Sequence, residues 1–148
     1  MKINFDEIEP VFGYIINSAI AYPLENTKHL VCRSHPHVEI KGWATGNQTL
    51  GTPVTKVEIS SDGGINWIEA EITHKEDKDK ANSKVFTWVL WRFNVDVSKL
   101  SGNKATVMVR AWDSEGYTQT KRIEELFNLR GLLNNAPHSI SFFFKIVD

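Results

Sequence analysis

The sequence predicts an all-β sandwich built from short strands. Several segments alternate apolar and polar residues with the period of two that is typical of half-buried strands. Gly, Asn, Asp and Pro turns separate these segments, and no segment has a convincing helical period. The 148 residues, 41% of them hydrophobic and 24% charged, fit one globular domain.

The composition argues against several classes of function. A formal net charge of -1 does not favour nucleic-acid binding, which requires a basic surface. No apolar run approaches the roughly 20 residues of a membrane-spanning helix. The acidic first ten residues lack the apolar core of a secretory signal, so we expect a soluble chain without a targeting signal. The single cysteine, Cys32, excludes a disulfide within the chain.

The clearest element is a β-hairpin between residues 54 and 72. Residues 54–60 alternate, with Glu58 among the polar members, and residues 68–72 alternate again. Asp-Gly-Gly at residues 62–64 joins the two halves, because a tight hairpin turn needs residues that accept positive φ. We therefore expect two consecutive strands here.

Further strands are expected on both sides of this hairpin. Residues 38–44 and 107–111 alternate, and residues 141–147 supply a closing strand. The longest β-like run, residues 85–97, is apolar on both faces in its first half, as in a strand that is covered twice. The mixed-charge run at residues 74–80 is expected to be a solvated loop.

The N-terminal part has no clean period. Pro10, Pro23 and Pro36 interrupt it, so we expect a short extended segment near residues 11–16 and then an irregular arm. The resulting division is an arm at residues 1–36 and an immunoglobulin-like (E-set) β-sandwich of five to seven strands at residues 37–148. The paired cysteines of true immunoglobulin domains are absent, so this likeness is architectural.

Five motifs stand out along the chain. They are Asn-Ser-Ala-Ile-Ala-Tyr-Pro (17–23), Val-Glu-Ile-Ser-Ser-Asp-Gly-Gly-Ile-Asn-Trp (57–67), Trp-Val-Leu-Trp (88–91), Val-Arg-Ala-Trp-Asp-Ser-Glu-Gly-Tyr-Thr-Gln (109–119) and Phe-Asn-Leu-Arg-Gly-Leu-Leu-Asn-Asn-Ala (127–136). In the same order, they resemble motifs of the dimerisation domain of the molybdenum-cofactor (Mo-co) oxidoreductases, a family that includes sulfite oxidases and assimilatory nitrate reductases. The resemblance covers nearly all of residues 14–140.

The chain also departs from the pattern of this family. Phe127 replaces a usual Trp, and residues 137–140 replace the usual Trp-His-Arg-Val. In the family, a basic residue in the loop before the central hairpin reaches towards the anion site of the catalytic domain. The corresponding loop here, residues 45–53, contains no Arg or Lys, which puts direct substrate contact in doubt.

The resemblance implies a role within a larger enzyme. The chain would be a C-terminal domain that forms a homodimer and supports a molybdopterin catalytic domain, which residues 17–23 would join. The molybdenum–molybdopterin cofactor and oxygen-atom transfer would belong to that domain. Sulfite oxidation is favoured over nitrate reduction by the Gly-Thr-Pro-Val-Thr-Lys-Val ending of the loop, residues 51–57. The family resemblance implies a mitochondrial or cytoplasmic location.

The sequence gives little support to the hypothesis that this chain is catalytic. Potential metal ligands, one Cys and three His between residues 29 and 37, lie in the expected irregular arm without a second half-site. Glu69 and Glu71 lie two residues apart on one strand, where solvated edge residues explain them better than an acid–base pair. We therefore expect no catalytic, cofactor-binding or metal-binding residue here, and a chain that is not catalytic alone.

An interface is the favoured use of the surplus aromatic residues. Five Trp and eight Phe exceed what one sandwich core requires, although filling the core and its rim is the alternative explanation. Trp and Arg are enriched at binding hot spots. The candidate interface residues are Trp88, Trp91, Arg110, Trp112 and Arg130. A free-standing sandwich that binds a protein or a glycan remains the alternative from another class.

Overall fold

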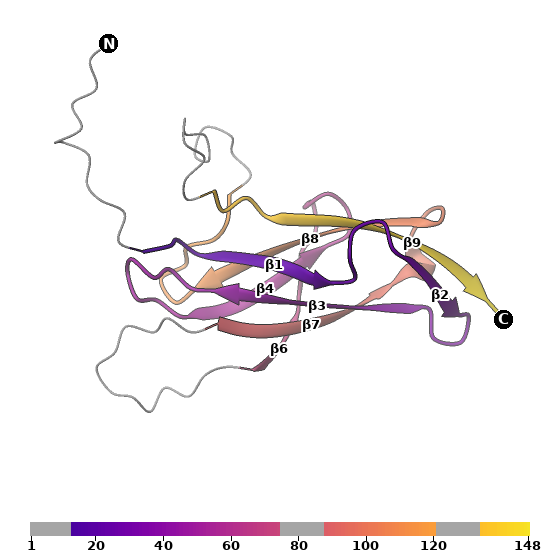
Figure 1. Ribbon diagram of the computed structural model, residues 1–148, viewed down its shortest axis with the longest axis horizontal. Helices are drawn as coiled ribbons and strands as arrows, with labels where there is room; N and C mark the ends of the chain where they lie inside the picture. The colour runs from indigo at the N-terminus through magenta and orange to yellow at the C-terminus, as the bar shows by residue number, and fades with distance from the viewer. Residues whose placement is uncertain (1–12, 75–87, 121–133) are drawn as a thin grey trace, which may run out of the picture.

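The computed structural model describes residues 13–74, 88–120 and 134–148. In this part of the chain two β-sheets pack face to face as a sandwich, which confirms the predicted all-β, immunoglobulin-like class (Figure 1). Three predictions concern residues outside these ranges: the start of the strand at residues 85–87, the charged run from residue 75 onward, and Arg130 with most of its motif.

One sheet has four strands and is antiparallel throughout. Its order is β1 (Asn17–Tyr22), β3 (His37–Thr45), β7 (Trp88–Asp96) and β6 (Glu71–His74). β3 and β7 pair along their full length, from His37 opposite Asp96 to Thr45 opposite Trp88. This long pair is the frame of the sheet, and it confirms the strands predicted at residues 38–44 and within 85–97.

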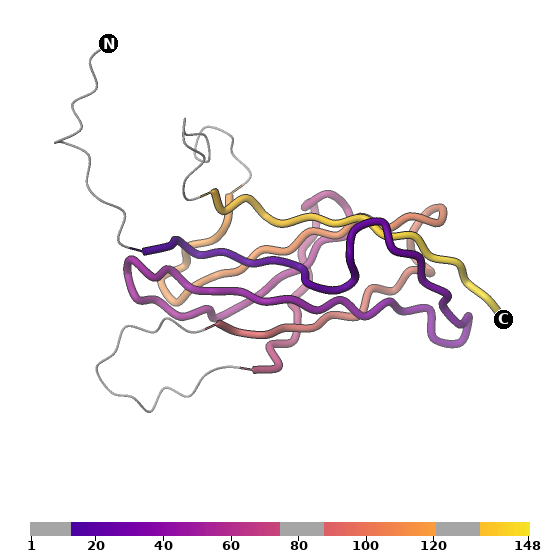
Figure 2. The backbone as a smooth tube through the Cα atoms, viewed as in Figure 1, coloured from indigo at the N-terminus to yellow at the C-terminus, as the bar shows by residue number. Residues whose placement is uncertain are grey.

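The second sheet has five strands. Its order is β2 (Lys28–Cys32), β9 (His138–Val147), β8 (Lys104–Asp113), β4 (Val54–Ser60) and β5 (Ile68–Glu69). β2 runs parallel to β9, and the other neighbours are antiparallel. Figure 2 shows β2 and β9 running side by side towards the C-terminus. A 3-10 turn, Val97–Lys99, follows β7 and leads to β8.

The core lies between the two sheets, where alternate residues of each strand point inward. Trp91 on β7 is its largest fully buried side chain, with 1% of its surface exposed. Gly42 on the neighbouring strand makes room for it, because a Cβ at residue 42 would lie 2.3 Å from the Trp91 ring and 2.1 Å from the carbonyl oxygen of Ala19. The close approach of β1, β3 and β7 therefore requires glycine at this position.

The N-terminal segment corrects the expectation of an irregular arm at residues 1–36. Its described part contributes β1 to one sheet and β2 to the other. Hydrophobic alternation does not reveal β1, because one of its buried residues is Ser18. The Ser18 hydroxyl donates to Gln119 Oε1 at 2.6 Å. Pro23 lies between the two strands and interrupts neither.

The predicted hairpin is present, but its return half is divided between the sheets. β5 pairs with β4 only through Ile68 and Glu69, and β6 then pairs with β7 in the opposite sheet. The crossing occurs at Ala70, a buried residue whose N–H donates to the carbonyl oxygen of Val57 at 2.8 Å. The strand β4 is also not half-buried as expected, because Glu58 on its polar face is covered.

Candidate functional site

The outer face of the four-stranded sheet carries an apolar strip in its centre. Trp43 on β3 and Trp88 on β7 lie side by side, with ring centroids 4.5 Å apart and planes tilted by 45°. Trp88 and Leu90 are 51% and 49% exposed. Ala19 and Ala21 of β1 continue the strip to the edge of the sheet. We call this surface, Trp43, Trp88, Leu90, Ala19 and Ala21, the tryptophan face.

Two ion pairs flank the tryptophan face. Lys41 Nζ lies 2.7 Å from Glu39 Oε2 on β3, and Arg92 of β7 donates two hydrogen bonds of 2.9 Å to the carboxylate of Glu71 on β6. The hydrogen bonds from Arg92 hold the pKa of Glu71 below its usual range. Each pair joins opposite charges, so the face carries both signs without a local excess of either.

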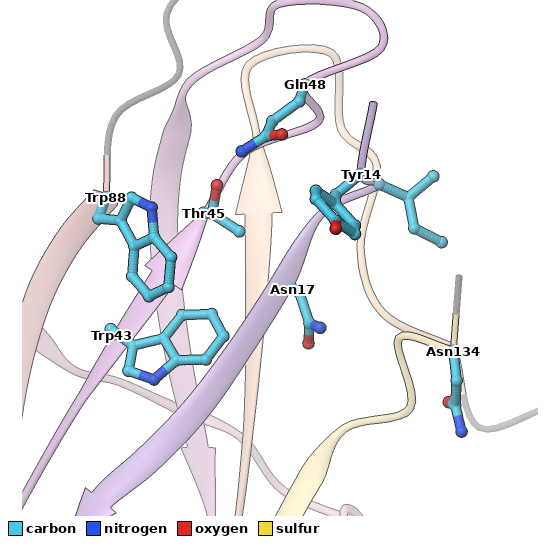
Figure 3. A pocket seen from close by; sticks show the side chains of 8 residues that line it. Tyr14, Asn17, Trp43, Thr45, Gln48, Trp88 and Asn134 are labelled. Carbon is cyan, nitrogen blue, oxygen red and sulfur yellow. The ribbon is translucent and has the colours of Figure 1, made fainter. Parts of the chain in front are cut away.

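A pocket of about 260 Å³ opens at one end of the tryptophan face (Figure 3). Trp43 and Trp88 form one wall, and Tyr14 lies across from them. Asn17, Thr45, Gln48 and Asn134 bring polar groups to it, and Ile15 completes the lining. Within the described residues, the buried Thr45 hydroxyl has no hydrogen-bond partner. A buried polar group in this state is destabilising unless a ligand or partner satisfies it.

The outer face of the five-stranded sheet carries a different cluster, centred on Arg110 of β8. Its guanidinium lies over the rings of Trp67 and Trp112, 4.1 and 5.0 Å from their centroids. Arg110 Nε donates to Glu58 Oε2 at 2.7 Å, and Trp112 Nε1 donates to the same oxygen at 2.6 Å. Lys56 completes the cluster with its Nζ 2.8 Å from Glu58 Oε1.

We call Arg110, Trp67, Trp112, Glu58 and Lys56 the arginine cluster, and Glu58 is the carboxylate that contacts both of its cations. Its side chain is only 11% exposed, and this burial raises the pKa. Hydrogen bonds from Lys56, Trp112 and Arg110 outweigh the burial and hold the pKa of Glu58 below its usual range. The carboxylate is therefore charged at neutral pH and fixes two cations in place: Arg110, and Lys56, whose Nζ lies 4.9 Å from the centroid of the Trp112 ring.

The predicted interface residues do not form a single site. Arg110 and Trp112 meet in the arginine cluster, and Trp88 lies on the opposite outer face. Trp91 fills the core between the sheets, and Arg130 lies outside the described residues. The Trp-x-x-Trp motif thus places one indole outside the sandwich and one inside, since residues three apart on a strand point to opposite faces.

Three further residues belong to these surfaces and were not singled out in the sequence. Trp43 shares the polar side of β3 with Glu39 and Lys41, and an aromatic residue among charged ones was a usable signal. Glu58 and Trp67 gave no such signal. Their roles depend on the register that places Glu58 opposite Arg110 and on the hairpin that returns Trp67 to the same face.

Among residues 13–74, 88–120 and 134–148, no group of three or more His, Cys, Asp or Glu side chains gathers as metal ligands. The Cys32 thiol contacts the Ser34 hydroxyl at 3.0 Å, and this contact lowers the pKa of Cys32. Among the same residues no helix is long and apolar enough to cross a membrane.

Known proteins resemble the chain over most of its length. Residues 9–144 match the family model of the Mo-co oxidoreductase dimerisation domain. Sulfite oxidase of Arabidopsis thaliana is 31% identical over 143 residues, which are 94% of this chain and 34% of that protein. An NADH nitrate reductase of Brassica napus is 38% identical over 97 residues, 66% of this chain and 10% of that protein.

A solved structure supports the same fold. The sulfane dehydrogenase SoxCD from Paracoccus pantotrophus superposes with a TM-score of 0.60 at 22% identity, covering 90% of this chain and 33% of that one. At this identity the likeness concerns the fold alone. The chain spans about a third or less of the length of each of these proteins.

Proposed function

Because the chain belongs to the family of Mo-co oxidoreductase dimerisation domains, we propose that it joins two protomers of a molybdenum enzyme and supports the catalytic domain. The molybdenum–molybdopterin cofactor and the oxygen-atom transfer would then belong to that catalytic domain. This chain would contribute structure, and none of its residues would contact the reacting atoms.

The match to the family over residues 9–144 is the observation that most supports this proposal. The surface of the sandwich is consistent with it. Trp88 and Leu90 are half exposed two residues apart on the outer face of the four-stranded sheet, and apolar patches of this kind mark protein interfaces. A sandwich of two sheets is also a rigid support, which a domain that holds two protomers in fixed positions requires.

We propose sulfite oxidation, the conversion of sulfite to sulfate, as the reaction of the parent enzyme. The sulfite oxidase of Arabidopsis thaliana aligns with 94% of this chain, whereas the nitrate reductase of Brassica napus aligns with 66%. The Gly-Thr-Pro-Val-Thr-Lys-Val ending of the loop before β4, residues 51–57, favours the same choice.

Nitrate reduction is the second candidate, and one observation favours it. The nitrate reductase is 38% identical over the 97 residues of its alignment, whereas the sulfite oxidase is 31% identical over the 143 residues of its longer alignment. Assays of the holoenzyme that contains this chain with sulfite and with nitrate decide between the two. Turnover of nitrate without turnover of sulfite would overturn the first choice and leave the pairing role intact.

The pairing role is tested by the molar mass of the chain in solution. Sedimentation equilibrium across a dilution series from about 100 µM to 0.1 µM covers the range in which specific homodimers dissociate. We expect a dimer that persists at low micromolar concentration. A mass of 16.9 kDa, the monomer value, at every concentration would overturn pairing by this chain.

A further inference from the structure

We propose that the pocket beside Trp43 and Trp88 binds one uncharged sugar ring, with a pyranose as the class of ligand. Such binding depends on the walls of the pocket and not on the proposed pairing of two protomers. It gives this end of the sandwich a ligand-binding role, where the proposed function requires only structure.

The pocket has one aromatic side that suits the apolar face of a sugar ring. Trp43 and Trp88 form this side, and Tyr14 lies across from them (Figure 3). More than half of the surface of Trp88 and of Tyr14 is exposed, so a ligand has access to their rings. The face of an aromatic ring is negative and attracts groups with a small positive charge, such as the C–H groups of a pyranose.

The polar groups of the pocket have unused capacity for hydrogen bonds. The buried Thr45 hydroxyl has no partner among the described residues. The Gln48 amide also makes no hydrogen bond to a described residue, and it points with the Thr45 hydroxyl towards the same end of the pocket (Figure 3). The side-chain oxygens of Asn17 and Asn134 accept hydrogen bonds from backbone N–H groups, whereas their NH₂ groups lining the pocket remain available for an acceptor on a ligand. A ligand rich in hydroxyl groups, which both donate and accept, satisfies all of these groups.

The composition of the lining argues against a charged ligand. None of the eight described residues that line the pocket is Asp, Glu, Lys, Arg or His. An anion or a cation would therefore be buried without an opposite charge, which is costly. A quaternary ammonium ion, which also binds to aromatic rings, would in addition leave the hydroxyl and the amides without partners.

The size of the pocket favours a single ring. Its volume of about 260 Å³ lies below the roughly 300 Å³ at which pockets for drug-sized ligands begin. The pocket therefore suits one pyranose, either free or at the end of a longer glycan that continues into solvent.

The Thr45 hydroxyl is better suited to binding than to folding. A buried hydroxyl without a partner destabilises the free chain, whereas a valine of nearly the same shape requires no partner. A hydrogen bond to a sugar hydroxyl would offset this loss in the complex alone. Replacing Thr45 with valine should therefore have opposite effects on stability and on binding.

An NMR titration of the full chain tests the proposal through the N–H signals of its five indoles. The probes are the methyl glycosides of glucose, mannose and galactose. We expect the signals of Trp43 and Trp88 to shift with at least one of them, with a dissociation constant on the order of 1 mM for a ligand of this size. The signals of Trp91 in the core and of Trp112 on the other outer face should not shift.

Matched Thr→Val substitutions separate binding from folding. Thr45→Val removes the hydroxyl from the pocket, and Thr106→Val removes an exposed hydroxyl from β8 in the other sheet. We expect Thr45→Val to weaken binding about tenfold, because one hydrogen bond is lost, while its urea midpoint stays equal to that of the wild type or rises. We expect Thr106→Val to change the dissociation constant by less than about twofold.

Each outcome decides the proposal. Shifts confined to Trp43 and Trp88, with weaker binding in Thr45→Val alone, support it. No shift with any of the three glycosides at about 50 mM, equal shifts of all five indoles, or equal losses in the two variants would overturn it. Shifts with choline chloride and with none of the sugars would show that a cation occupies the pocket, which would also overturn it.

Discussion

Replacing Glu58 with glutamine tests whether one buried carboxylate holds the arginine cluster together. Glutamine keeps the shape and one acceptor oxygen, but it removes the charge that Arg110 and Trp112 contact at 2.7 and 2.6 Å. Removing one partner of a fully buried ion pair costs about 3–5 kcal/mol. Arg110 is 24% exposed, so water replaces part of the lost interaction. We expect a loss of roughly 2 kcal/mol in the free energy of unfolding.

Urea unfolding followed by circular dichroism and tryptophan fluorescence measures this loss. With a dependence on urea of about 2 kcal/mol per molar, typical of small proteins, the midpoint should fall by about 1 M. Glu69→Gln is the matched control, because Glu69 lies opposite Glu58 on the neighbouring strand but is exposed. Its midpoint should stay within about 0.2 M of the wild type. Equal effects of the two substitutions would refute the argument.

The dependence on pH provides a second check of the same reasoning. The pKa of Glu58 is lower in the folded protein than in the unfolded chain. Its stabilisation is therefore complete above the unfolded value near 4.3 and is lost as the pH falls through the folded value. The difference in the free energy of unfolding between wild type and Glu58→Gln should become smaller as the pH falls from 7 to 3. A difference that stays constant across this range would show that the charge of Glu58 does not stabilise the fold.

Four further substitutions have outcomes that urea unfolding checks. Trp91→Ala should cost about 3–5 kcal/mol because it empties the core, whereas Trp88→Ala should cost less than about 1 kcal/mol in dilute solution; similar losses would contradict their assignment to core and surface. Gly42→Ala should cost about 3 kcal/mol, because the new methyl group meets the Ala19 backbone; wild-type stability would disprove that close approach. Asp62→Ala should lower the urea midpoint more at pH 7 than at pH 3. Hydrogen bonds from the Asn66 N–H, the Ser60 hydroxyl and the Asn66 side chain hold the pKa of Asp62 far below its usual range, and the stabilisation they give is lost in acid. Equal shifts of the midpoint at the two pH values would count against this account of Asp62.

Much of the fold is predictable from the sequence because each sheet has one buried face. Where the buried positions are apolar, as in β3, β7 and β8, the period of two locates the strand: its predicted ends lie within one residue of the observed ends in β3 and within three residues in β8. The period of two does not reveal a strand in which a buried position is polar. Ser18 in β1 is buried by virtue of its hydrogen bond to Gln119, more than a hundred residues away, and no local pattern contains that partner.

The same limit explains why the surfaces were harder to predict than the strands. Sequence reasoning selected aromatic and Arg residues as interface candidates, but it grouped Trp88 with Arg110 although the sandwich places them on opposite outer faces. Alternation assigns residues to one side of a strand without saying which sheet the strand joins. The crossing at Ala70, which passes the return half of the hairpin from one sheet to the other, leaves no mark in the period of residues 68–72.

The separation of the two surfaces has a physical consequence for how the domain can be used. An apolar face whose neighbouring charges form ion pairs can pack against an identical copy of itself. The outer face of the five-stranded sheet, on which Arg110 and four lysines outnumber Glu58 and Glu69, would instead repel a copy and attract an acidic surface. The two kinds of contact should therefore respond differently to salt. If two copies meet on the tryptophan face, raising the salt from 50 to 500 mM should change the dimer dissociation constant by less than about threefold, because screening acts mainly on unbalanced charge. A dimer that tightens strongly with salt would instead indicate repulsion between cationic faces in contact.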